Sequence, residues 1–286
     1  MSISNVVLIV KKGDTKALDF ARKVTAWLST LNVTVFCEHG VDISSAKPLP
    51  GAELISNAQL MIVSGGDGTF LHAASLMDTQ TIPIIGINMG SLGFLTPFTH
   101  VTSHTGIEAA LEGKLEIRER MRLDAGVFRN GERIFHSIAA NDCVINHQNM
   151  ARLLEINCHV DNMFMTNMKS DGLIISTPMG STAYALAAGG PVLYPGMDCI
   201  SIVPICPHQL TQRPMVIPAA SCLRVELKND GYITIDGQRG LPVRCGDELH
   251  VSHSALPLQV ILPQDYSIFN VLRHKLSWGI RESTNA

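Results

Sequence analysis

The stretch Ile62–Ala73, "IVSGGDGTFLHA", joins a run of aliphatic residues to the start of a helix through three glycines, an aspartate and a threonine. In an open α/β sheet, ligands bind beyond the carboxyl ends of the strands. Glycines at such an end accept positive φ and let backbone N–H groups approach an anion. A helix beginning at Thr69 would add the positive end of its dipole. The stretch therefore indicates a phosphate loop.

The carboxylate of Asp67 in this loop has two interpretations. Beside a polyphosphate it is repelled, unless it helps to hold Mg²⁺ or accepts a proton from an attacking hydroxyl. Alternatively, Asp67 caps the next helix and the glycines only make a turn. The chain contains neither the GxGxxG fingerprint nor the Walker GxxxxGK[ST] pattern. The spacing of these residues leaves both interpretations open.

Strand and helix patterns alternate on either side of the loop in the first third of the chain. Apolar spacing predicts a helix over Asp14–Leu31, capped by Asp14 or Thr15, and a short helix over Phe70–Met77. Pro48–Gly51 is expected to be a loop. Aliphatic runs predict strands at Asn5–Val10, Val33–Glu38, Ala58–Gly66 and Thr81–Asn88. This rhythm predicts a parallel sheet with helices on its faces.

Beyond Leu115 the pattern changes to short strand-like runs separated by turn residues, which is typical of an all-β domain. One helical segment, Gly180–Gly190, interrupts it, and a last helix is expected over Ile268–Trp278. We therefore expect an α/β domain at residues 1–115, completed by 267–286, and an all-β domain of stacked sheets at 116–266. The strand-like runs are Arg133–Ala139, Asp142–Asn146, Leu153–Val160, Gly172–Ser176, Ile200–Val203, Leu223–Leu227, Tyr232–Ile235, Glu248–Val251 and Leu258–Leu262.

Composition excludes several functional classes. The net charge of −3 gives no general attraction to nucleic acid or to acidic membranes. No apolar run is long enough to span a membrane, and Val6–Val10 is too short for a signal peptide. Seven scattered cysteines, none in CxxC, fit a reducing compartment, so we expect a cytoplasmic protein. The histidine pairs His100/His104 and His250/His253 lack the HExxH arrangement, which argues against a metal site.

Several further motifs give the glycine loop a context. GGDGT after an apolar strand resembles the phosphate loop of NAD kinases, diacylglycerol-type lipid kinases and phosphofructokinases. The motifs that separate these families resemble those of bacterial NAD kinases, in order and at compatible spacing over most of the chain. They are "INMGSLGFLT" at Ile87–Thr96, "ANDCVINH" at Ala140–His147, "SDGLIISTPMGSTAYALAAGGPVL" at Ser170–Leu193 and "DGQ" at Asp236–Gln238. The implied fold is a phosphofructokinase/NAD-kinase-like α/β domain followed by a β-rich NAD-binding domain.

The resemblance implies an ATP-dependent NAD kinase. Such an enzyme transfers the γ-phosphoryl group of ATP to the 2′-hydroxyl of the adenosine ribose of NAD, giving NADP. Its partners are NAD and ATP, and Mg²⁺ or another divalent cation bridges the ATP phosphates without a dedicated protein site. Family members take NAD contacts from adjacent subunits, which implies a homodimer or homotetramer. The residues leave open whether polyphosphate replaces ATP, whether NADH is accepted and whether NADP(H) feeds back.

The resemblance also assigns roles to individual residues. Asp67 corresponds to the catalytic aspartate, the proton acceptor for the 2′-hydroxyl. Asn141 and Asp142 match an Asn-acidic pair suited to a ribose diol, where the family more usually has glutamate second. Met179 stands where a small polar residue is common. The ATP phosphates are assigned to Gly65, Gly66, Gly68 and Thr69. NAD is assigned to Asp67, Gly68, His72, Asn141, Asp142, Arg152, Lys169, Asp171, Thr182, Ala183, Tyr184, Ala187 and Gln238.

Two other classes of protein would share some of these sequence features. A diacylglycerol- or sphingoid-type lipid kinase has the GGDGT loop, but it has no reason to carry the GSTAY block. A non-catalytic dinucleotide sensor would keep the fold and lose phosphoryl transfer, yet this chain keeps the carboxylate of Asp67. The NAD kinase interpretation therefore accounts for more of the motifs than either alternative.

Overall fold

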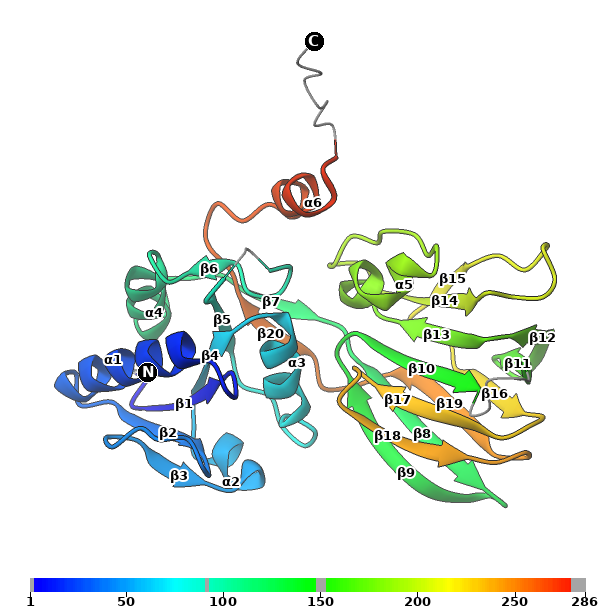
Figure 1. Ribbon diagram of the computed structural model, residues 1–286, viewed down its shortest axis with the longest axis horizontal. Helices are drawn as coiled ribbons and strands as arrows, with labels where there is room; N and C mark the ends of the chain where they lie inside the picture. The colour runs from blue at the N-terminus through cyan, green and yellow to red at the C-terminus, as the bar shows by residue number, and fades with distance from the viewer. Residues whose placement is uncertain (1–2, 91–92, 148–152, 279–286) are drawn as a thin grey trace, which may run out of the picture. The chain divides into compact units, whose positions relative to one another are not determined.

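The structure is a computed structural model that describes residues 3–90, 93–147 and 153–278 (Figure 1). The chain divides into two compact units. The first contains the described residues of 1–76, 82–118 and 259–286, and the second those of 77–81 and 119–258. No helix in the described part of the chain is both long and apolar enough to cross a membrane.

The first unit is built on a sheet whose strand order is β3-β2-β1-β4-β5-β20-β7, with β6 paired to β5. The pairs β1–β2, β1–β4, β4–β5 and β5–β20 are parallel. Because β2 and β4 lie on opposite sides of β1, the order reverses between β1 and β4, which creates a topological switch point. The strands are β1 Asn5–Val10, β2 Thr34–Glu38, β3 Lys47–Leu49, β4 Leu60–Gly65, β5 Ile84–Asn88, β6 Phe98–Thr99, β7 Ile117–Arg120 and β20 Leu258–Ile261.

Helices cover both faces of this sheet. α1 (Thr15–Thr30) buries Ala17, Ala21 and Leu28 at helical spacing, packed with α4 (Ser103–Leu111) and alternate strand residues in one core. α3 (Asp67–Ser75) buries Phe70 and packs against β4. The carboxylate of Asp14 accepts the N–H groups of residues 16 and 17, so Asp14 is the N-cap of α1. The remaining helices of this unit are α2 Gly51–Ser56 and α6 Ile268–Leu276.

The second unit consists of two antiparallel sheets. Their strand orders are β15-β14-β13-β10-β17-β18 and β12-β11-β16-β19-β8-β9. Alternate residues of both sheets, such as Ile145, Ile156 and Val251, meet in one apolar core, so the sheets stack face to face. The strands are β8 Leu123–Arg129, β9 Glu132–Ala139, β10 Asp142–His147, β11 Leu154–Val160, β12 Met163–Ser170, β13 Gly172–Ser176, β14 Cys199–Ile205, β15 Met215–Pro218, β16 Leu223–Leu227, β17 Gly231–Ile235, β18 Arg239–Val243 and β19 Glu248–His253.

The predicted fold class is confirmed, with corrections in detail. Pro48–Gly51 is not a loop, because its first two residues belong to edge strand β3 and Gly51 begins α2. Proline is tolerated there since an edge strand leaves one side unpaired. The run Leu258–Leu262 forms β20, which pairs with β5 and so belongs to the parallel sheet. The chain accordingly rejoins the first unit at Gln259, before the expected return at residue 267.

Candidate active site

The glycine-rich turn lies beyond the carboxyl end of β4, beside the switch point of the first sheet. Gly65 ends the strand, Gly66 is the N-cap of α3, and the helix begins at Asp67 rather than at the expected Thr69. Positive φ was the wrong reason for these glycines, because neither Gly66, with φ of −115°, nor its neighbours in the turn adopt it. A Cβ built on Gly66 or Gly68 meets only open space. These two glycines therefore leave the backbone accessible from outside.

The carboxylate of Asp67 does not cap its helix. Its Oδ2 accepts the N–H of Phe94 at 2.9 Å, and its Oδ1 accepts the N–H of Leu95 at 3.0 Å and the hydroxyl of Thr96 at 3.2 Å. No side-chain cap bond is made at the start of α3. A carboxylate offers about four acceptor positions, so one position on Oδ2 stays open. The three donors fix the orientation of the carboxylate and leave it able to accept one more hydrogen bond.

The segment that follows β5 supplies these donors. The amide of Asn88 donates to Thr96 Oγ1 at 2.8 Å, which orients the hydroxyl toward Asp67. A Cβ on Gly93 would lie 2.2 Å from Asp67 Oδ1, so only glycine fits there. These residues belong to the motif "INMGSLGFLT", for which the sequence predicts no individual residue roles. This motif is therefore the sequence signal for a second element of the site.

Asp67, Gly65 and Gly66 line a polar pocket of about 290 Å³ within the first unit. Lys11 and Asp14, which follow β1, also line it and pair with each other at 3.2 Å. The carboxyl ends of the neighbouring parallel strands β1, β4 and β5 thus meet around one pocket. Exposed glycine amides, a lysine and a fixed carboxylate suit a phosphorylated ligand.

His72 lies on α3 but does not line this pocket. Its Nε2 contacts Oε1 and Oε2 of Glu38 at 3.0 and 3.1 Å, at the end of β2. The hydrogen bond with His72 lowers the pKa of Glu38. The ring therefore has a protein partner, and its expected contact with NAD finds no geometric support.

In the second unit, Asn141 and Asp142 lie buried where β10 begins. The carboxylate of Asp236 accepts three backbone N–H groups there, from Ala140 at 2.8 Å, Asn141 at 2.7 Å and Asp142 at 3.0 Å. Asp236 is the first residue of "DGQ" and has a φ of 52°. The motif therefore positions the Asn-acidic pair through Asp236, whereas the resemblance predicts a contact from Gln238.

The side chains of the Asn-acidic pair are left short of partners. Asn141 Oδ1 is buried, and no hydrogen-bond donor reaches it within the described residues. No donor to the Asp142 carboxylate is seen in that same part of the chain. Burial, with a contribution from the charge of Asp236, raises the pKa of Asp142 to about 7. Burial also raises the pKa of Asp236, although its three N–H donors oppose the shift. Unpartnered buried acceptors usually mark a ligand or water position.

The segment "STPMGST" packs closely on this pair. Thr177 Oγ1 donates to the carbonyl of Ala140 at 2.7 Å, and a Cβ on Gly180 would lie 2.2 Å from the carbonyl oxygen of Asn141. The predicted single helix is wrong here. A 3₁₀ turn over Met179–Thr182 is followed by the non-helical Ala183 and a short helix α5, Tyr184–Ala187. Small residues permit this close approach of backbones.

The other residues assigned to NAD are dispersed. Lys169 in β12 pairs with Glu155 at 3.2 Å, in the other sheet from the Asn-acidic pair. Gln238 is exposed in the turn between β17 and β18, where its N–H donates to Ile235. Tyr184 is 46% exposed, which leaves its ring free to contact a ligand. Asp171 is partly buried between β12 and β13, and Arg152 lies outside the described residues.

Arg122 is a buried cation that no sequence pattern predicts. The guanidinium of Arg122 donates to the carbonyls of Leu256 at 2.7 Å and Met77 at 2.9 Å. Burial lowers the pKa of Arg122 to about 10, while the charges of Asp78 and Asp236 oppose the shift. Arg122 therefore offsets part of the negative charge at Asp236. Its neighbours are far away in the sequence, so no local pattern indicates its burial.

Comparisons with known proteins agree with the two-unit architecture. Residues 6–115 match the model of the ATP-NAD kinase N-terminal domain, and residues 140–262 match that of the ATP-NAD kinase C-terminal domain. The chain is 38% identical to the NAD kinase of Geobacter sulfurreducens, covering 98% of this chain and 100% of that one. It is 40% identical to the NAD kinase of Syntrophobacter fumaroxidans, covering 96% and 99%.

Two solved structures share the fold. A yeast NADH kinase complexed with NADH superposes with a TM-score of 0.91 at 22% identity, covering 100% of this chain and 90% of that one. An NAD kinase from Archaeoglobus fulgidus in complex with ATP superposes with a TM-score of 0.77 at 24% identity, covering 96% and 98%. With matching models over both units and full-length relatives, the chain belongs to the ATP-NAD kinase family.

Proposed function

We propose that this protein transfers the γ-phosphoryl group of ATP to the 2′-hydroxyl of the adenosine ribose of NAD, forming NADP and ADP. Family membership supports the reaction. The observation that carries the catalytic assignment is the carboxylate of Asp67, which three donors hold at the edge of a glycine-lined pocket with one acceptor position open.

Asp67 orients the attacking hydroxyl and takes its proton, and the exposed amides of Gly66 and Gly68 receive phosphate oxygens. Little covalent chemistry is required of the protein in phosphoryl transfer, since positioning and charge neutralisation supply most of the catalysis. A carboxylate with a fixed orientation suits this role better than a mobile one. Lys11 adds positive charge at the wall of the same pocket.

Asn141 and Asp142 hold a diol of the dinucleotide. The unpartnered Oδ1 of Asn141 and the carboxylate of Asp142 are acceptors, and ribose hydroxyls are donors. The aspartate is one methylene shorter than the usual glutamate, and Asp236 fixes the backbone that carries it. Tyr184, with its exposed ring, offers a surface for packing against a base.

A divalent cation fits this pocket as part of the ATP complex. The described residues hold no group of three or more His, Cys, Asp or Glu side chains able to bind a metal ion. Mg²⁺ commonly binds through one or two carboxylates, waters and substrate phosphates, and Asp14 and Asp67 line the pocket. When bound, the cation neutralises phosphate charge.

We also propose a cytoplasmic homodimer or homotetramer. All seven cysteines are free, as expected for a reducing compartment. The oligomer is proposed from the family alone. Light scattering coupled to gel filtration measures it, and a monomeric mass at assay concentration would contradict it.

A coupled assay for NADP formation from NAD, ATP and Mg²⁺ tests the function. Asp67→Asn is expected to lower turnover by about 10³-fold, since general base catalysis contributes on the order of 10²–10⁴, while NAD affinity changes little. Asp19→Asn, an exposed carboxylate on α1, is the matched control. Wild-type protein that makes no NADP but phosphorylates diacylglycerol would refute the assignment. Full activity of Asp67→Asn would refute the base role alone.

A further inference from the structure

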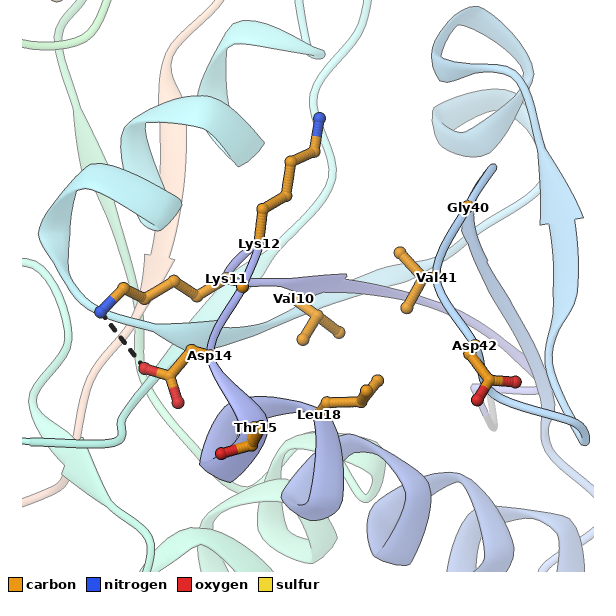
Figure 2. A pocket seen from close by; sticks show the side chains of 10 residues that line it. Val10, Lys11, Lys12, Asp14, Thr15, Leu18, Gly40, Val41 and Asp42 are labelled. Atoms are coloured by element: carbon orange, nitrogen blue, oxygen red, sulfur yellow. Dashed lines mark ion pairs between the residues drawn. The ribbon is translucent and has the colours of Figure 1, made fainter.

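Arg122 is a buried cation that has no role in the reaction as proposed above. Lys11, the cation beside the Asp67 pocket, keeps 54% of its side chain exposed and pairs with Asp14 (Figure 2). Arg122 is only 1% exposed, and its guanidinium donates to two backbone carbonyls. Burying a charge costs free energy unless hydrogen bonds compensate it. What this burial achieves therefore depends on where the two carbonyls lie in the chain.

Both carbonyls lie close to points where the chain passes from one unit to the other. Met77, which accepts from Nη1 of Arg122, directly follows the first passage, and Leu256, which accepts from Nε, precedes the last passage by two residues. Arg122 itself comes four residues after the third passage, and all three residues belong to the second unit. One guanidinium thus connects segments at three of the four passages. The passages follow Leu76, Thr81, Arg118 and Leu258.

Further bonds hold the same segments together. The carbonyl of Arg122 accepts the N–H of Ser254 at 2.8 Å, and Oγ of Ser254 accepts the N–H of Leu256 at 3.2 Å. The segment after the first passage has a second anchor, because the carboxylate of Asp78 pairs with Arg239 of β18. Side-chain and backbone bonds therefore fix these segments relative to Arg122.

The same segments lead to the two elements that fix Asp67. Asp67 is the first residue of α3, and Met77 comes two residues after the end of that helix. Leu256 precedes β20, which pairs with β5, and β5 leads to the segment whose N–H groups bind the Asp67 carboxylate. Arg122 thus connects the end of the helix that carries this carboxylate with the strand that lies next to the source of its donors.

We propose that Arg122 is a positioning residue for the phosphoryl transfer, which fixes the segments at Met77 and Leu256 and thereby the placement of the Asp67 carboxylate. The inference rests on the proposed kinase function, because Arg122 acts through Asp67. Arg122 does not line the Asp67 pocket, so its loss removes no substrate contact there. Its loss should lower kcat rather than substrate affinity, because a displacement of about 1 Å at the reacting groups can cost on the order of 10²-fold in rate.

Arg122→Lys and Arg129→Met distinguish this role from a merely structural one. Lysine keeps the positive charge near Asp236 but donates from one nitrogen, so it does not reproduce a contact made by two. We expect kcat to fall about tenfold, with the KM values for ATP and NAD within about twofold of the wild type. Arg129, in the same unit, bonds to the Asp247 carboxylate at 2.8 and 2.7 Å, so Arg129→Met should also lower the melting temperature but keep kcat.

Hydrogen exchange tests the anchoring of α3 without depending on activity. In Arg122→Lys the amides of α3 should exchange faster than in the wild type, while those of α1, in the same unit, should not change. Wild-type protein that forms no NADP refutes the kinase function, and the exchange of α3 then still tests its anchoring by Arg122.

Three results overturn the inference: an unchanged kcat in Arg122→Lys, an unchanged exchange of α3 in that variant, or an equal fall of kcat in Arg129→Met. If Arg122→Lys does not fold, Asp78→Ala decides, because it removes the second anchor of the segment after α3. This variant should lower kcat by about threefold at unchanged KM values, since a partly exposed ion pair contributes modestly. Full turnover of Asp78→Ala overturns the inference.

Discussion

Replacing Asp142 by asparagine is expected to stabilise the protein at high pH relative to low pH. The carboxylate is buried beside Asp236, and no donor is seen among the described residues to compensate its charge. Burying an ionised carboxylate without a partner costs free energy. Asparagine has nearly the same shape and cannot ionise, so it removes this cost.

The structure gives the size and the sign of the effect. The pKa of Asp142 rises from 3.8 to about 7 on folding. Between these pH values the folded state binds more protons than the unfolded state, so stability falls as pH rises. At about 1.4 kcal/mol per pKa unit, the penalty is on the order of 4 kcal/mol at pH 8, and about 2 kcal/mol of it develops between pH 5.5 and 8. The buried asparagine amide costs roughly 1–3 kcal/mol, but at every pH alike.

The pH dependence is therefore the quantity to measure. We would determine the melting temperatures of the wild type, Asp142→Asn and the exposed control Asp265→Asn at pH 5.5 and 8. Relative to the wild type, the melting temperature of Asp142→Asn should be several degrees higher at pH 8 than at pH 5.5. The melting temperature of Asp265→Asn should follow that of the wild type at both pH values. If Asp142→Asn and the wild type show parallel pH profiles, the carboxylate is not buried in a charged form and the reasoning fails.

Three further substitutions test the supports of the site. Gly66→Ala should fold normally, because its Cβ meets open space, but it should raise the KM for ATP. Gly93→Ala should lose most turnover, because its Cβ displaces the carboxylate of Asp67. Melting temperatures and steady-state kinetics of the two variants check this. Asp236→Ala should lower stability by about 2–4 kcal/mol, because three backbone N–H groups lose the carboxylate that accepts their hydrogen bonds, and it should raise the KM for NAD. Unchanged NAD kinetics in a folded variant would contradict its positioning role.

Much of the fold follows from local patterns in the sequence. Asn5–Val10 is recognisable as a strand because aliphatic β-branched residues run uninterrupted, and α1 because its apolar residues recur every three or four positions. Leu258–Ile261 shows the limit of such patterns. A short apolar run predicts a strand but not its partner, so its parallel pairing with β5 follows only from tertiary structure.

The candidate site also has parts that local sequence patterns predict and parts that only the tertiary structure reveals. The GGDGT turn lies within one stretch, so its position at a strand end was readable from the sequence. The donors to Asp67 lie 27 to 29 residues away, and the amides that Asp236 holds lie 94 to 96 residues away. No periodicity links residues at such separations, because the topology of the sheets brings them together. Motifs at those positions identify the residues but do not indicate their hydrogen-bond partners.

The contrast between Asp67 and Asp142 follows from their surroundings rather than from their chemistry. Asp67 receives three donors, which fix its orientation beside the glycine-lined pocket. Asp142 is buried, receives no donor within the described residues and lies near the charge of Asp236, so its ionised form is disfavoured. In the function proposed above, a bound ligand supplies the donors. Binding of a diol at Asp142 should therefore strengthen as pH rises through about 7. A carboxylate that costs stability when empty and gains hydrogen bonds when occupied makes part of the folding free energy conditional on substrate.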